Sequence, residues 1–346
     1  DREGEAIAWH VAQAIVPKDG TVKRILFNEI TPKAVRQSID KSSDLDLQKV
    51  NAQQARRVLD RLVGYEISPL LWKVIHAGLS AGRVQSVAAR LICERDDEIN
   101  AFEQVEYWSV DAYLHKEAKS EVFRARVLQF KGEKISIPNE EAAGEITSAL
   151  EKAEFSVVEV KRREQRRRPS APFITSTLQQ DCARKLRFTV KRTMAVAQRL
   201  YEGAEVDGET RGLITYMRTD SVRVADDAIQ QVREEIGKLY GAEYVPDKPN
   251  AYKTKRGAQD AHEAIRPTDV SLHPNRIREL VAPDQAKLYE LVWKRFVASQ
   301  MKPQVLDVIS VDIEAAEYLL RATGSSVKFP GFATLYTETR DESEEE

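Results

Sequence analysis

The stretch Tyr216–Ser221 (YMRTDS) contains a pair of side chains suited to phosphoryl transfer. In an extended chain, Tyr216 and Arg218 point to the same side. A tyrosine hydroxyl can attack phosphorus, while the fixed fork of a guanidinium holds the charged non-bridging oxygens. Taken alone, a Tyr-x-Arg pair is more often a half-buried structural feature of a strand. Both interpretations stay open at this point.

A second candidate is the stretch Ser80–Ser86 (SAGRVQS), which precedes a strongly periodic helix. A serine cap, a glycine that permits close backbone approach and the free N–H groups of a first helical turn would form a phosphate cradle. Arg83 would add positive charge. An ordinary capped helix is the alternative interpretation.

Residues 53–72 combine clustered arginines with aromatic side chains on a predicted helix. This mixture suits single-stranded nucleic acid, because bases stack on aromatic rings and phosphates pair with guanidinium groups. A surface of ordinary salt bridges is the alternative.

Two further clusters carry charge or a titratable ring. Asp1, Glu3 and Glu5 stand ahead of a helix and could bind Mg²⁺, which prefers oxygen ligands, or could be a solvated acidic helix start. His262 and Arg266 lie in what we predict to be a short helical piece that ends at Pro267. His262 lacks metal-ligand spacing, so we interpret it as a hydrogen-bond donor to phosphate or as a structural residue.

The periodicity of the sequence predicts the elements that position these residues. Helical spacing dominates 47–100 and most of 176–301, whereas alternation predicts strands within 106–137, 155–160 and 305–336. The two β segments are similar enough to predict one domain that contains a helical insertion. The predicted domains are a partial α/β piece (1–44), a helical domain (45–101), a discontinuous β-rich domain (102–168 with 302–340), an inserted helical domain (169–301) and an acidic tail (341–346).

Composition narrows the class of protein. The chain has 346 residues, 42% of them hydrophobic and 31% charged, which indicates a folded protein of two or more domains without a membrane-spanning run. Its two cysteines are far apart, which argues against a disulfide framework or a zinc site and fits a reducing compartment.

The basic run 161–168 is either a solvated linker or a phosphate-facing strip. Because the chain opens on a charged turn without Met, we expect it to be part of a longer protein.

Together these stretches resemble one family, the type IA DNA topoisomerases in their bacterial topoisomerase I form. Five matches occur in the family's order across nearly the whole chain: DREGE (1–5), SAGRVQS (80–86), PFITSTLQQ (172–180), YMRTDS (216–221) and AHEAIRP (261–267). The resemblance implies a multidomain fold of α and β structure. It would comprise part of a Toprim α/β domain, a helical domain, and a β-rich arch domain whose helical insertion bears the nucleophile.

The resemblance also implies roles for individual residues. Tyr216 would be the nucleophile that forms a 5′-phosphotyrosine, Arg218 would position the scissile phosphate, and His262 would contact the backbone nearby. Gln198, Glu202 and Thr215 would support this active site, and Asp1 and Glu3 would bind Mg²⁺. The residues implied to contact DNA are Arg56, Arg57, Asp60, Arg61, Tyr65, Trp72, Ser80, Ala81, Gly82, Arg83, Val84, Gln85 and Arg218.

The implied function is relaxation of negatively supercoiled DNA by transient single-strand cleavage, strand passage and religation. Transesterification conserves bond energy, and the sequence has no GxxxxGK[ST] loop for ATP. Single-stranded and supercoiled duplex DNA would be the partners of a monomer in the bacterial cytoplasm, associated with the nucleoid.

The family's earlier aspartate, glutamate and lysine have no counterpart in this chain. We therefore expect an incomplete Mg²⁺ site and no relaxation by this fragment alone. A non-catalytic single-strand-binding module, or a Toprim nuclease or primase, are the rival interpretations.

Overall fold

The computed structural model describes residues 2–15, 20–116, 121–206, 208–253 and 262–337. The chain divides into two compact units, each assembled from three segments. The first unit comprises 1–103, 173–224 and 253–290, and the second comprises 104–172, 225–252 and 291–346. This division is coarser than the predicted domains, whose boundaries stay a prediction. None of the helices in the described ranges combines the length and apolar character needed to cross a bilayer.

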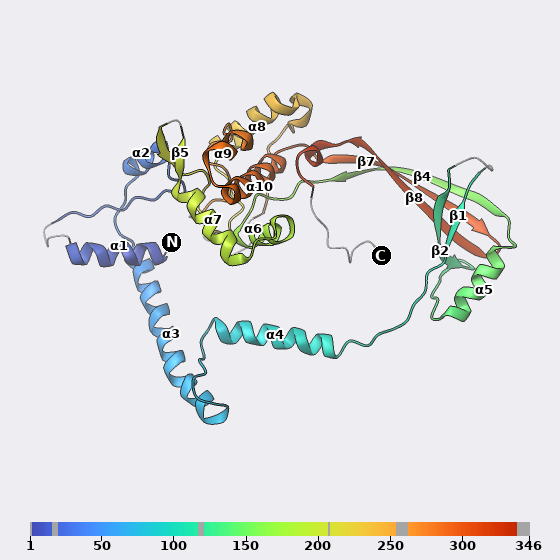
Figure 1. Ribbon diagram of the computed structural model, residues 1–346, viewed down its shortest axis with the longest axis horizontal. Coiled ribbons are helices and arrows are strands. Elements are labelled where there is room, and N and C mark those ends of the chain that lie inside the picture. Colours follow the sequence, from blue (N-terminus) through green and yellow to red (C-terminus); the bar gives the residue numbers. More distant parts are fainter. Residues whose placement is uncertain (1, 16–19, 117–120, 207, 254–261, 338–346) are drawn as a thin grey trace. The chain divides into compact units, whose positions relative to one another are not determined.

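The first unit begins with three helices, α1 (Arg2–Ile15), α2 (Pro32–Asp40) and α3 (Leu47–Val74) (Figure 1). Each of the latter two starts at a side-chain cap: Thr31 accepts the N–H of Ala34, and Asp46 accepts the N–H groups of Gln48 and Lys49. Helix α1 packs against α3. The buried carboxylate of Glu5 supports this contact, because it pairs with Arg24 and accepts the N–H of Asp46 at 2.7 Å.

Helix α4 (Gln85–Asn100) carries the apolar positions that the sequence pattern placed on one helix face. The helix itself is confirmed. Its apolar face is nevertheless in solvent, with Val87, Leu91 and Ile92 exposed by 54%, 61% and 70%. No residue of α4 is buried within the part of the chain that the structure describes.

The rest of the first unit surrounds a core that includes Leu178, Leu200, Ile214, Ile265 and Ile277, all fully buried. Its elements are α6 (Thr175–Asp181), a π-helical turn (Cys182–Leu186), α7 (Val190–Glu202), the hairpin β5 (Ala204–Val206) and β6 (Glu209–Arg211), α9 (Pro274–Leu280) and the first turns of α10 (Pro283–Ser299).

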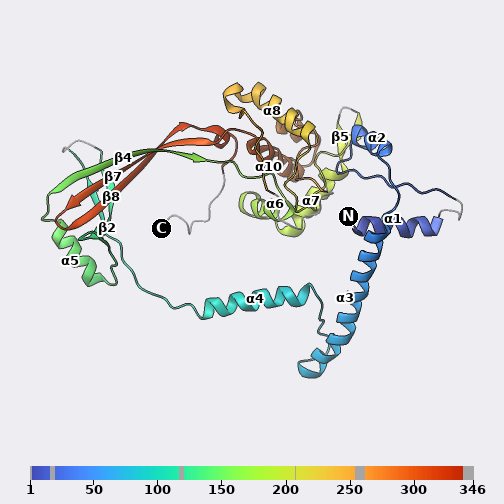
Figure 2. The ribbon, with the colours of Figure 1, turned by 180° about the vertical axis from the view of Figure 1, so that it is seen from behind.

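The second unit is built on one antiparallel sheet with the order β1-β2-β8-β7-β4, and β3 pairs with β2 (Figure 2). Its strands are β1 (Asp111–Leu114), β2 (Phe123–Phe130), β3 (Glu133–Lys134), β4 (Phe155–Arg167), β7 (Gln304–Ala315) and β8 (Tyr318–Phe329). Strands from both predicted β segments therefore share one sheet, as their alternating patterns led us to expect.

Helix α5 (Glu140–Leu150) packs against one face of this sheet at one of its ends (Figure 1). Its buried Ile146 and Leu150 pack with Ala125 of β2 and with Ile313 and Leu320 of the β7–β8 hairpin. Helix α8 (Asp226–Tyr240) also belongs to the second unit. Tyr252 follows α8 in the sequence. Its hydroxyl oxygen lies 3.0 Å from the carbonyl oxygen of Pro169 and 2.7 Å from that of Ser299.

The basic run 161–168 is not a linker, which corrects one of its two predicted interpretations. Residues 161–167 continue β4, because the hydrogen-bonded ladder with β7 extends to the pair Arg167 and Gln304. β4 is the last strand of the sheet, and all of its residues are exposed. Whether the run faces phosphate stays a prediction.

Candidate active site

The segment around Tyr216 is held by neighbours far away in the sequence. The Tyr216 N–H donates to Asn28 O at 2.9 Å, and the Thr215 N–H donates to Arg266 O at 2.9 Å. The buried Thr215 hydroxyl donates to Ala264 O at 2.7 Å. The backbone groups of this segment are thereby paired without a continuous strand partner.

This arrangement corrects two predictions about local structure. Residues 213–219 form no regular strand, because Met217 and Arg218 lie in a bend, so the alternation argument for Tyr216 and Arg218 does not apply. Residues 262–267 are extended rather than helical. Isolated bridges pair Phe173 with Ile265 and Ile214 with Pro267.

A largely buried ion triad joins Glu29 to two residues of the piece at 262–267. Arg266 Nη2 lies 3.1 Å from a carboxylate oxygen of Glu29 and 2.8 Å from one of Glu263. The side chains of Arg266 and Glu263 are only 6% and 8% exposed. Removing one member of such a group would leave a buried charge without its counter-charge, which is strongly destabilising. The triad therefore joins the loop at 28–30 to the piece at 263–266, whose Arg266 carbonyl accepts the N–H of Thr215.

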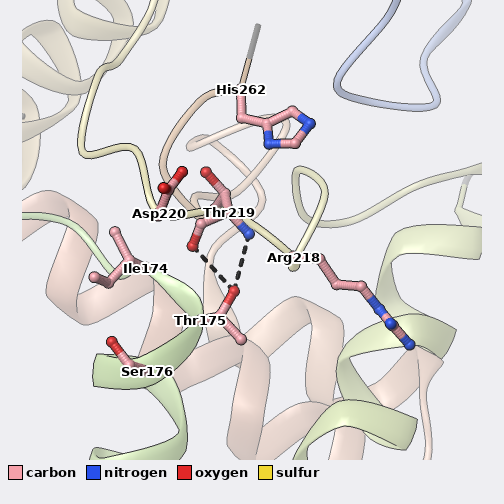
Figure 3. Close-up of a pocket in the computed structure, with 7 residues that line it drawn as sticks. All are labelled: Ile174, Thr175, Ser176, Arg218, Thr219, Asp220 and His262. Carbon is pink, nitrogen blue, oxygen red and sulfur yellow. Dashed lines mark hydrogen bonds between the residues drawn. The ribbon is translucent and has the colours of Figure 1, made fainter. Parts of the chain in front are cut away.

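Thr175, at the start of α6, holds the other end of the Tyr216 segment. Its Oγ1 lies 2.8 Å from Met217 O and 3.0 Å from Thr219 O, to either of which its proton can be donated. The same oxygen accepts the N–H of Thr219 at 2.9 Å, and Thr175 N–H donates to Thr219 O at 2.9 Å. Figure 3 shows this hydroxyl directed at the Thr219 backbone.

The half-buried ring of Tyr216 lies between two other rings. The centroid of Tyr201 is 5.3 Å away and that of His262 is 5.9 Å away, both in edge-on geometry. Burial raises the pKa of Tyr201, so its hydroxyl stays protonated near neutral pH. Burial also lowers the pKa of the His262 imidazole, which favours the neutral ring.

Beside this cluster, Arg218 and His262 line an open cleft of about 380 Å³ (Figure 3). Its other lining residues are Ile174, Thr175, Ser176, Thr219 and Asp220. In Figure 3 the exposed Arg218 side chain extends away from His262. The lining of the cleft thus includes a guanidinium, an imidazole and hydroxyl groups, all of which can bind phosphate, and the Tyr216 ring packs against the His262 ring.

Gln198 and Glu202 do not line this cleft. They lie on α7 and bond to each other, with Gln198 Nε2 donating to Glu202 Oε1 at 2.8 Å. Thr215 is buried, and its interactions are those of a structural residue. The supporting roles of these three residues stay a prediction.

The predicted groove residues of α3 mostly have acidic or aromatic partners. Arg56 pairs with Glu3 at 3.0 Å, and Arg83 pairs with Asp60 at 2.6 Å. The guanidinium of Arg61 lies 5.5 Å from the centre of the Tyr65 ring. The hydrogen bond from Arg83 holds the pKa of Asp60 below its usual range.

Arg57 and Trp72, two other predicted groove residues, have no acidic partner in the described part of the chain. Arg57 forms no ion pair within the described part of the chain. Trp72 is 49% exposed, and its indole N–H donates to Leu79 O at 2.6 Å.

The stretch 80–86 differs from the predicted phosphate cradle. Helix α4 begins after Val84, and no side chain caps it, so the expected serine cap is wrong. Serine hydroxyls accept hydrogen bonds from the loop before α4 instead. Ser86 accepts the N–H of Gly82 at 3.1 Å, and Ser68 of α3 accepts the N–H of Ala81 at 3.1 Å. Two amides that were expected to be free for phosphate are therefore bonded within the chain. Gln85 Nε2 lies 3.4 Å from Ser80 Oγ.

The predicted metal ligands do not form a site in the described residues. Asp1 and the tail 341–346 lie outside them, and the carboxylate of Glu3 pairs with Arg56. No group of three or more His, Cys, Asp or Glu side chains in those ranges could hold a metal ion. The Mg²⁺ site stays a prediction.

Comparison with known proteins assigns the family. The sequence model of the family described as DNA topoisomerase matches residues 44–346. The chain therefore belongs to the bacterial topoisomerase I family of type IA DNA topoisomerases.

Individual relatives are DNA topoisomerase 1 of Rickettsia bellii and of Rickettsia felis, each 48% identical to the whole chain. The chain spans only 44% and 46% of their lengths. Among solved structures, full-length topoisomerase I from Thermotoga maritima matches 98% of this chain and 54% of its own, with a TM-score of 0.80 and 39% identity.

Sequence reasoning singled out Tyr216, Arg218 and His262, which the structure brings together. It gave no role to Thr175 or Asp220, although both lie within motifs that carry the family resemblance. It also missed Glu29, because a lone carboxylate has no spacing signal until the fold sets it beside Arg266.

We predict that Thr175→Val destabilises the chain by about 1–3 kcal/mol, because the buried Thr219 N–H loses its acceptor. Denaturant unfolding of the 346-residue chain measures this change. Thr175→Ser keeps the hydroxyl and should restore most of the stability, whereas Ser176→Ala, at an exposed neighbouring position, should stay within about 0.5 kcal/mol of the parent. Equal stability of the valine and serine variants would contradict the assigned role.

Proposed function

We propose that the protein to which this chain belongs relaxes negatively supercoiled DNA by transient single-strand cleavage, strand passage and religation. The observation that carries this proposal is the grouping of Tyr216 and His262 with Arg218 beside one cleft, in a chain of the topoisomerase family. A module that only binds DNA would need no phenol packed against a residue of this cleft.

The chemistry is a transesterification. The Tyr216 oxygen loses its proton and attacks phosphorus, the bond from phosphorus to the 3′ oxygen breaks, and the departing 3′ oxygen takes up a proton. The product is a 5′-phosphotyrosine and a free 3′-hydroxyl. Arg218 would hold the non-bridging oxygens, and the neutral His262 ring would donate a hydrogen bond to the backbone. Because one phosphodiester replaces another, the reverse reaction closes the break without ATP.

Within the described residues, the chain supplies Mg²⁺ with no set of three ligands, and Glu3 is already paired with Arg56. The transesterification as proposed involves the side chains of Tyr216, Arg218 and His262 and no bound metal. The metal's family role would be to hold DNA phosphates, with further ligands supplied outside the described residues.

We further propose that single-stranded and supercoiled duplex DNA are the partners of a monomeric enzyme in the bacterial cytoplasm, associated with the nucleoid. The single strand would follow the surface of α3, where Arg57 and Tyr65 are exposed. The charges of this surface would come from Arg56, Arg61, Arg83 and Asp60.

The central test is the Tyr216→Phe variant of the intact parent protein. It should bind single-stranded DNA as the parent does yet form no covalent adduct, because the attacking oxygen is gone. Denaturing gel electrophoresis of labelled oligonucleotide measures the adduct. Tyr201→Phe removes a neighbouring hydroxyl from the same ring cluster and should leave the adduct intact. An adduct in the Tyr216 variant would refute the nucleophile assignment.

The α3 surface gives a second prediction, on binding alone. Tyr65→Ala in the 346-residue chain should weaken single-strand binding by about 1–3 kcal/mol, the value of one stacked base, while Tyr65→Phe should keep it. Arg57→Ala should reduce the slope of log affinity against log salt by about 0.7, and Arg57→Lys should not. Anisotropy titrations across a salt series measure both. Isotherms that overlay the parent would mean that the strand does not follow this surface.

A third prediction concerns the 346-residue chain itself. With plasmid and Mg²⁺ it should show no relaxation, because Glu3, one of the two carboxylates expected to bind the metal, is already paired with Arg56. Gel electrophoresis of plasmid topoisomers, run beside the intact parent, measures this. Comparable rates for the two proteins would show that the chain holds a complete site.

A further inference from the structure

One face of the sheet in the second unit is not covered by α5 and is rich in arginine. Alternation sets Ala125 and Leu320 against α5, so their neighbours Arg124, Arg126 and Arg321 point to the opposite side. Tyr113 of β1 lies opposite Arg124 and shares this side. We call Tyr113, Arg124, Arg126, Arg321 and Lys161 the arginine face.

The strand register extends this face to β4. Arg126 of β2 lies opposite Arg321 of β8, and Arg321 lies opposite Asp312 of β7. One row further along, Thr323 of β8 is opposite Ser310 of β7, which is opposite Lys161 of β4. Paired residues of an antiparallel ladder lie on the same face, so Lys161, which pairs with Glu159 at 2.6 Å, lies on the same face as the three arginines.

A cleft of about 400 Å³ opens on this face, lined by Arg124, Arg126, Leu128, Arg321 and Thr323. The three arginine side chains that line it are 52%, 40% and 40% exposed. The cleft is therefore accessible and basic.

Carboxylates orient these guanidinium groups without using all of their donors. Asp111 accepts from Arg124 Nη2 at 2.6 Å and from Arg126 Nε at 3.1 Å. Asp312 accepts from Nε and Nη2 of Arg321 at 2.6 and 2.8 Å. A guanidinium has five N–H donors, so each arginine keeps donors for a ligand. Arg126 and Arg321 lie at directly opposite positions, so one anion placed between them can accept from the remaining donors of both.

We propose that the arginine face is a second binding surface for single-stranded DNA, separate from the α3 surface. Arg124, Arg126, Arg321 and Lys161 contact successive phosphates, and a base stacks on the Tyr113 ring, which is 70% exposed. Cationic side chains beside an exposed aromatic ring favour a single strand, whose bases are free to stack. The inference rests on the proposed function only in taking DNA as the ligand.

The test compares two double variants of the 346-residue chain that change charge equally. R124Q/K161Q removes two cations from the arginine face, and Asp111 keeps its bond to Arg126. K152Q/R162Q is the control: Lys152 follows α5, and Arg162 lies one residue from Lys161 on the opposite side of β4. Anisotropy with a labelled single-stranded oligonucleotide across a salt series measures affinity.

We expect the salt slope of R124Q/K161Q to fall by about 1.4 relative to the parent, two phosphates at about 0.7 each, and that of K152Q/R162Q to be unchanged. Tyr113→Ala should weaken binding about 5- to 150-fold, the range for one stacked base, and Tyr113→Phe should not. The variants Tyr113→Ala and Tyr113→Phe leave the bonds of Asp111 and Asp312 to the arginines intact. Their comparison therefore tests the proposal even if R124Q/K161Q unfolds. Photocrosslinking followed by peptide mapping should find the strand on β1 and β2.

Equal salt slopes for the two double variants, together with unchanged binding by Tyr113→Ala, would overturn the proposal. In a parallel titration with a duplex oligonucleotide, variants that weaken only duplex binding would overturn the assignment to a single strand. Failure here is distinct from failure of the proposed function, because adduct formation at Tyr216 is scored separately. Intact protein that carries R124Q/K161Q and still forms the adduct, with no change in single-strand affinity, would refute this inference alone.

Discussion

A buried segment outside any sheet must find partners for its backbone groups elsewhere, and the chain around Tyr216 finds them in three directions. The loop at Asn28 accepts the N–H of Tyr216, the piece at 264–266 exchanges hydrogen bonds with Thr215, and the Thr175 hydroxyl bonds Thr219. These partners lie far apart in the sequence. The position of the phenol therefore depends on the folding of the whole first unit, and the buried triad of Arg266, Glu29 and Glu263 secures the same contact with charge.

Much of the fold could be predicted from periodicity. The helical spacing of 47–100 gives α3 and α4, and the alternating residues of the two β segments give strands of one sheet. The conformations of 213–219 and 262–267 could not be predicted, because tertiary partners decide them rather than local preference. The serines of 80–86 were misjudged for a related reason: their hydroxyls are as well suited to a loop amide as to a helix start, and no spacing rule separates the two uses.

The candidate site was predictable in its charged and aromatic members and not in its hydroxyl and carboxylate supports. Tyr216, Arg218 and His262 stand in recognisable motifs, and the fold brings them to one place. Thr175 and Glu29 act through single hydrogen bonds or ion pairs to residues that are distant in sequence. On α3 and on the sheet, carboxylates likewise hold arginines in place; exposed pairs of this kind add little stability, so their main effect is on the direction of the guanidinium groups.

Strand β4 has a consequence for the behaviour of the protein in concentrated solution. An edge strand of this length presents a row of unpaired backbone groups, which is a template for pairing with a strand of another molecule. Five of the seven residues 161–167, its second half, are lysine or arginine. Two copies brought edge to edge would juxtapose these positive charges and repel. The basic run thus protects the sheet from self-association, and a variant that neutralised it would expose the chain to aggregation through an otherwise intact fold.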